Sequence, residues 1–216
     1  MTLAPEDDGT VLARAMDMEL PGHGDATRVQ VGRAELVLEN RRGSFSLLWS
    51  DGREARRYVL GLTDRGQLRV ELRVPRLPLC CVPRDVVTLV PGARLRGYVT
   101  VPLVPTVVWR RDDAPAEPLV ELVPDELQAT WDEQKGHAFE VGVSWLSRFP
   151  FRSGAAQAIA PLRLANRGDA VVSPRHLDVQ LTDDGLWEIR GALVARPQRL
   201  VWGEDGLSGP GTGADA

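Results

Sequence analysis

One segment holds most of the side chains that could do chemistry together. Between residues 131 and 152 the chain carries aromatic, acidic and cationic groups at close spacing: Trp131, Lys135, His137, Trp145, Arg148 and Arg152. Such a set could form a pocket for a small anionic ligand, with the cations binding the anion and the indoles lining the walls. The alternative is a charged turn or frayed helix whose two Trp residues anchor it to a core. We favour this second interpretation.

Catalysis has little support in the sequence. A nucleophilic site needs a Ser or Cys, a base and an orienting acid, but the chain has three His and no G-x-S-x-G motif. His23 lies in a glycine-flanked loop and His176 directly precedes an expected strand, so we interpret both as exposed polar residues. No catalytic residue is assigned, and a hydrolase with a dispersed carboxylate or histidine site is the lowest-ranked hypothesis.

The sequence predicts no metal and no cofactor. Cys80 and Cys81 are adjacent, so they cannot close a disulfide loop, and with no His near them in sequence they make a poor zinc site. We expect both to be buried free thiols in a strand. The adjacent carboxylates Asp112-Asp113, Asp132-Glu133 and Asp183-Asp184 fall in expected loops, where solvated turns explain them better than metal binding.

Composition restricts the classes of partner. The net charge is -4, and acidic and basic residues are interleaved, which disfavours nucleic-acid binding. The start of the chain lacks the order of a secretory signal. The apolar run from Tyr98 to Trp109 is short for a membrane helix and contains two prolines. We therefore expect a soluble, cytoplasmic protein without a membrane span.

The dominant pattern is alternation of apolar and polar residues, which is typical of half-buried strands. The clearest example is 67–74, where the alternation continues over eight residues. One helix candidate, 124–134, has Asp125 and Glu126 in its first turn, although it could instead be a strand. The tail from Gly203 is expected to be disordered. The other expected strands are 28–31, 34–39, 44–49, 58–62, 86–89, 95–101, 139–143, 158–165, 171–172, 177–181, 186–189 and 193–194.

The organisation of the chain suggests a duplication. Pro83-Arg84, Leu95-Arg96-Gly97 and Val108-Trp109 recur in the same order as Pro174-Arg175, Ile189-Arg190-Gly191 and Val201-Trp202.

The charged, proline-containing stretch 110–118 is the best linker candidate. We predict an all-β protein of two tandem immunoglobulin-like sandwich halves with at most a short helix between them. The predicted parts are an N-terminal extension 1–26, sandwiches 27–112 and 113–203, and a tail 204–216; one continuous β structure is the alternative.

A set of proline-rich and glycine-rich phrases resembles a known family. They include Arg76-Leu77-Pro78, the run from Pro91 to Val99, Trp145 to Pro150 and Pro161 to Asn166. Together they look like the uncharacterised prokaryotic family called domain of unknown function 432, over roughly residues 28 to 202. The resemblance implies no activity and supplies no catalytic residue.

The sequence therefore predicts a binding or assembly module rather than an enzyme. Sandwich folds offer sheet edges and end loops to partners, and no reaction centre is recognisable. A protein partner or self-association is the expected interaction. The main rival is a sensor of a small anionic ligand at the segment from Trp131 to Arg148.

Overall fold

The computed structural model describes residues 14–32, 34–42, 44–61, 66–111, 116–124, 127–132, 136–150, 154, 156–203 and 206–208. Within these ranges the regular structure is β, apart from one short 3-10 helix, η1 (Asp183–Gly185). The predicted all-β class is confirmed. The described residues contain no helix with the length and apolarity needed to span a bilayer.

The chain forms two compact units, and each is assembled from separate stretches of sequence. Unit 1 comprises Met1–Arg73, Val104–Val123 and Gly154–Ala156, and unit 2 comprises Val74–Leu103, Pro124–Ser153 and Gln157–Ala216. This division differs from the predicted tandem halves. Strands β9 (Val104–Arg110) and β10 (Glu117–Glu121), on either side of the expected linker, pair with each other inside unit 1.

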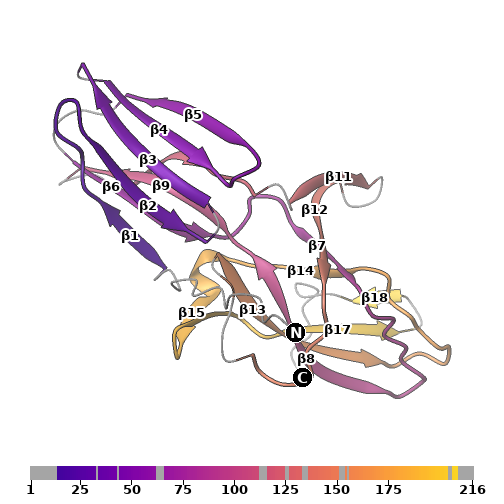
Figure 1. Ribbon diagram of the computed structural model, residues 1–216. Coiled ribbons are helices and arrows are strands. Elements are labelled where there is room, and N and C mark those ends of the chain that lie inside the picture. Colours follow the sequence, from indigo (N-terminus) through magenta and orange to yellow (C-terminus); the bar gives the residue numbers. More distant parts are fainter. Residues whose placement is uncertain are drawn as a thin grey trace, which may run out of the picture. The chain divides into compact units, whose positions relative to one another are not determined.

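Unit 1 contains two four-stranded antiparallel sheets, as expected for a β-sandwich (Figure 1). The first has the order β1-β6-β9-β10, with β1 (Ala15–Met18) and β6 (Gln67–Arg73). The second has the order β2-β3-β4-β5, with bounds Ala26–Val31, Ala34–Arg41, Ser44–Ser50 and Ala55–Leu60. Strands β4 and β6 bury one face, as the alternation predicted, whereas β9 is buried on both faces.

The core of unit 1 follows from this period of two. Phe45, Leu47 and Trp49 alternate with less buried residues along β4, and β6 shows the same pattern. Burial of each such side chain contributes on the order of 2 kcal/mol. On the opposite face of the second sheet, Arg57 donates to Glu39 at 2.9 Å, and this hydrogen bond lowers the pKa of Glu39.

One sheet of unit 2 combines parallel and antiparallel pairing. Its order is β11-β12-β7-β14, with bounds Gln128–Asp132, Gly136–Val143, Leu79–Pro83 and Leu177–Val179. Strand β7 pairs parallel with β12 and antiparallel with β14. The ladder between β7 and β12 is extended at both ends, because Phe139 N donates to Pro78 O and Arg84 N donates to Val143 O, each at 2.8 Å.

The other sheet of unit 2 is built around β13 (Gln157–Asn166). Strand β8 (Arg94–Pro102) pairs with it antiparallel, while β16 (Ala192–Ala195) and β17 (Gln198–Gly203) run parallel to it in succession. The register advances by one residue between β16 and β17, around Pro197, which has no N–H for a ladder bond. The sheet also contains β15 (Leu186–Ile189) and β18 (Gly206–Ser208).

The tight hairpin between β15 and β16 has a clear local cause. Ile189 pairs with Ala192, so two residues form the loop, and both have positive φ: 53° at Arg190 and 80° at Gly191. Two successive positive φ values define the type I′ turn, whose twist matches that of paired strands. Gly191 accepts this backbone conformation without a steric penalty.

A buried asparagine ties the end of β13 to two loops. Asn166 is 1% exposed, and its Nδ2 donates to Leu89 O at 2.9 Å and to Ala170 O at 2.7 Å. Its Oδ1 accepts from Gly168 N at 3.1 Å. Its backbone also pairs with Gly92 and Ala93. Because every polar group of this side chain is satisfied, its burial stabilises one loop arrangement.

Several expectations need correction. Residues 128–132 form β11 rather than part of a helix, because they pair with β12 and include Thr130 and Trp131, both strand formers. The predicted strands at 86–89 and 171–172 are reduced to a single bridge between Leu89 and Val172. In the tail, 206–208 form β18, which pairs with β17.

The duplication and the immunoglobulin-like topology remain predictions. Trp109, which ends the first predicted repeat, lies in unit 1, whereas Trp202, which ends the second, lies in unit 2. Both indoles are buried. The two repeat ends therefore contribute to different cores.

Replacing Asn166 tests the buried hydrogen-bond network. Asn166→Leu should lower the free energy of unfolding by about 3 kcal/mol, because buried carbonyls lose their donors. Urea denaturation measures the change. The control is Thr88→Val in the same loop, where the exposed Thr88 to Ser173 contact of 3.0 Å is removed at a cost below about 1 kcal/mol. An equally small effect of both variants would contradict the assigned role.

Candidate functional site

The β11–β12 hairpin holds the aromatic half of the predicted site. Trp131 and His137 are register partners, and their rings meet edge to face with centroids 4.7 Å apart at 64°. Strand β12 begins at Gly136, whose φ of 76° favours glycine. Thr130 Oγ1 donates to Ala138 O at 3.3 Å. The fold therefore brings Trp131 and His137 together, as the sequence segment suggested.

Trp131 is a large aromatic residue that is not buried. Its side chain shares a face with Phe139, which is 9% exposed, yet Trp131 itself is 65% exposed. The hairpin thus continues the apolar face of its sheet beyond the covered core. Large exposed aromatic side chains of this kind are enriched at protein interfaces.

Trp145 has a packing role instead. Its indole lies flat against Gly97 of β8, where an added Cβ would come within 2.4 Å of the ring. Next to it, Tyr98 and Leu146 exchange two backbone hydrogen bonds of 2.9 Å. The rings of Phe149 and Tyr98 also meet edge to face, with their centroids 5.5 Å apart. This arrangement fits the anchoring interpretation of Trp145.

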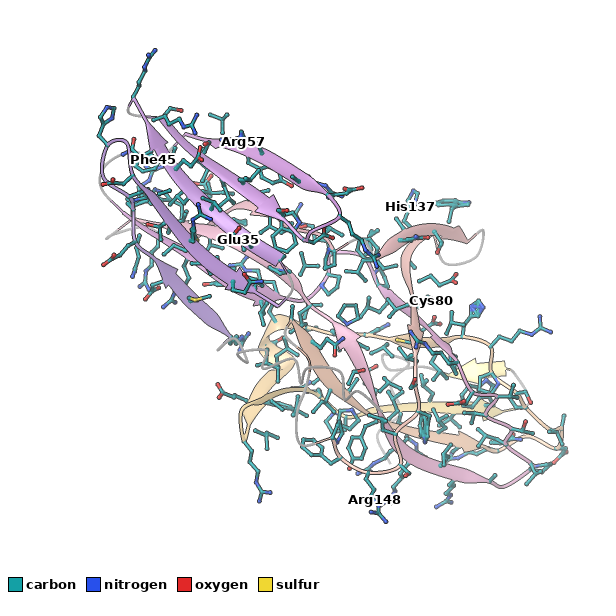
Figure 2. The ribbon with its side chains drawn as sticks, viewed as in Figure 1. Glu35, Phe45, Arg57, Cys80, His137 and Arg148 are labelled. Atoms are coloured by element: carbon teal, nitrogen blue, oxygen red, sulfur yellow. The ribbon has the colours of Figure 1, made fainter. Side chains whose placement is uncertain are left out.

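The described residues of the predicted pocket lie in separate places, apart from the pair Trp131 and His137. His137 is the second residue of β12, whereas Trp145 and Arg148 follow the end of this strand, which rises about 3.3 Å per residue. Figure 2 shows His137 and Arg148 in different parts of unit 2, and the Arg148 side chain is exposed. Lys135 and Arg152 lie outside the described residues.

Sequence reasoning missed a contact between a thiol and an imidazole. Cys80 Sγ lies 3.4 Å from His176 Nδ1, although the two residues are 96 positions apart. Spacing in the sequence could not show this contact. Antiparallel pairing of β14 with β7 makes Asp178 the register partner of Cys80 and puts His176, two residues earlier, on the same face. Both cysteines are buried and free, as predicted. Figure 2 marks Cys80 on β7.

The two adjacent thiols have different surroundings. Strand alternation sends Cys81 into the core, where it is 0% exposed, and Cys80 to the opposite face. Burial raises the pKa of Cys81 to about 12, with smaller contributions from Cys80 and Asp178. Within the described residues, no group of three or more His, Cys, Asp or Glu is placed to hold a metal ion.

Exposed apolar side chains mark two further surfaces of unit 2. Trp187 and Ile189 lie on one face of β15 and are 45% and 44% exposed. Val90 and Val171 are neighbours across the Leu89 to Val172 bridge, and both are more than half exposed. Their side chains are smaller or more covered than that of Trp131, which makes the hairpin the strongest candidate contact surface.

Comparison with known proteins adds no function to this geometry. No family model matches the chain, and no curated protein or solved structure is similar to it. The resemblance to domain of unknown function 432 therefore stays a prediction, and the site must be interpreted from its own residues.

The exposure of Trp131 predicts that it matters little for folding. Trp131→Ala should change the free energy of unfolding by less than about 1 kcal/mol, because little buried area is lost. Trp202→Ala, in the core of the same unit, should cost about 3 kcal/mol or more. Chemical denaturation of both variants checks this. A loss at Trp131 as large as that at Trp202 would mean that the indole is structural.

Proposed function

We propose that this protein is a non-enzymatic binding module that attaches to a protein partner through the β11–β12 hairpin. The observation that carries the proposal is the 65% exposure of Trp131 on a strand that ends the order β11-β12-β7-β14. An indole in water has a large apolar area left to bury. Truncation of such a residue at the centre of an interface typically costs 2 kcal/mol or more.

The position of Trp131 supports recognition of an extended segment. An edge strand presents backbone N–H and C=O groups that can pair with an added strand. Along β11, side chains alternate between the two faces of the sheet, so a partner strand would contact Trp131 and Ala129 on one of them. Backbone pairing would supply general affinity, and an apolar pocket for the indole would supply selectivity.

The hairpin also offers its anchor in a fixed arrangement. The rings of Trp131 and His137 meet edge to face, and β12 is in turn paired with β7 from Phe139 to Val143. Ordering a flexible side chain on binding costs roughly 0.5–1.5 kcal/mol, and a preorganised aromatic group avoids much of that cost. This is the arrangement expected of an interface anchor.

The alternative functions receive less support. A sensor of small anions would need Trp131 and Arg148 in one pocket, but Trp131 lies opposite His137 near the start of β12, whereas Arg148 follows the end of that strand. A hydrolase would need an oriented acid and a substrate cleft around a nucleophile. A cytoplasmic location is part of the proposal, and two free thiols agree with a reducing compartment.

Trp131→Ala should abolish partner binding while leaving the fold intact. Affinity capture from lysate of the source cells, with the intact protein as bait, would identify partners, and each would then be purified and titrated calorimetrically. The expected loss for Trp131→Ala is roughly 30-fold or more in affinity. Trp131→Phe should retain part of the binding, because the phenyl ring still fills an apolar pocket.

The matched control is Trp187→Ala, which removes a half-exposed indole from an edge strand in the same unit. It should bind like the unaltered protein. Equal affinities for the Trp131→Ala and unaltered proteins would refute the proposal. If sedimentation measurements showed a dimer that depends on Trp131, and no other protein bound, the partner would be a second copy of the chain.

A further inference from the structure

The outer face of the sheet formed by β11, β12, β7 and β14 carries an arrangement that the binding function does not use. Cys80 lies on this face, 9% exposed, with Asp178 as its register partner on β14 and Glu140 as its register partner on β12. His176 lies two residues before Asp178, on the same face, and is exposed. Its Nδ1 is 3.4 Å from Cys80 Sγ, within hydrogen-bond distance for sulfur.

We propose that Cys80 and His176 form a thiol modification site, at which Cys80 exchanges with small neutral or cationic disulfides. The thiolate is the reactive form of cysteine, and an adjacent base that accepts the thiol proton increases its supply. His176 Nδ1 is placed to accept that proton. This activity is independent of partner binding at the hairpin.

The chemical step is a thiol–disulfide exchange. The Sγ proton of Cys80 moves to His176 Nδ1, and the thiolate attacks one sulfur of the disulfide R–S–S–R. A new bond forms between Cys80 Sγ and that sulfur while the original S–S bond breaks. The departing thiolate R–S⁻ then takes the proton from the imidazolium, so the products are a mixed disulfide at Cys80 and R–SH.

The charges around the thiol set the class of disulfide. Asp178 and Glu140 border Cys80 on its two neighbouring strands, and a carboxylate on each side repels an anionic reagent. Arg84 lies on the same face but over Gly142, where an added Cβ would be 3.5 Å from the Arg84 Nε. With an acidic register partner on each neighbouring strand, Cys80 should react faster with neutral and cationic disulfides than with anionic ones.

The neighbouring thiol provides an internal comparison. Cys81 is one residue away in sequence but faces the core and is 0% exposed. Its pKa is raised to about 12 by burial, so it stays a thiol at neutral pH. Cys81 is therefore not the residue that resolves the mixed disulfide at Cys80, which a second external thiol must reduce.

The test measures the reaction rate of the folded protein with the neutral aromatic disulfide dithiodipyridine. In Cys81→Ala, the one remaining thiol should react without denaturant, whereas in Cys80→Ala reaction should require unfolding. His176→Asn should slow the Cys80 reaction at pH 7 by roughly tenfold and remove the inflection in its pH profile. Circular dichroism confirms that the variants fold, and peptide mass spectrometry locates the label in the unaltered protein.

Reagent charge supplies an independent test. Rates with dithiodipyridine and with the dianionic dithiobis(nitrobenzoate) are each normalised to those of N-acetylcysteine. The protein should favour the neutral reagent, and Asp178→Asn should reduce that preference. The proposal is overturned if Cys80 is labelled only on unfolding, if His176→Asn leaves both rate and pH profile unchanged, or if the anionic reagent reacts as readily. Loss of the Trp131-dependent interaction would not affect these outcomes.

Discussion

The hydrogen-bonded pairing of β7 with strands on both of its edges is the constraint on which both candidate sites depend. Parallel pairing with β12 and antiparallel pairing with β14 fix the register of five residues, Leu79 to Pro83. Because side chains alternate along a strand, this register sends Cys81 into the core and Cys80 to the outer face. A slip of one residue would exchange the two thiols and separate Cys80 from His176.

The same pairing positions the hairpin. Strand β12 is held along β7 from Phe139 to Val143, and its first residues continue beyond this ladder to pair with β11. Trp131 is thus attached to a central element of unit 2 and still remains exposed. An interface anchor needs an apolar side chain that is exposed and a backbone that is held in place by its neighbours. Cys80 and His176 lie on the opposite face of the same sheet. This sheet therefore carries both candidate sites, one on each face.

The sequence predicted what depends on local pattern and missed what depends on pairing between distant segments. Alternation correctly placed strands at 67–73 and 94–102, where burial of one face dominates. It could not show that β14 pairs antiparallel with β7, and so could not bring His176 to Cys80. The helix expected at 124–134 rested on two acidic residues at its start, whereas strand pairing decided the structure of 128–132. Likewise, closeness in sequence suggested one pocket for His137 and Arg148, whereas most of β12 lies between the two residues.

Nuclear Overhauser contacts across β7 test the register most directly. The account predicts contacts from the Phe139 ring to Leu79 and from the Cys81 β-protons to Val141 and Leu177, since these are register partners. The outer-face protons of Cys80 should instead contact Glu140 and Asp178. Contacts from Cys80 to Val141 or Leu177 would show the slipped register, and both candidate sites would then lose their structural basis.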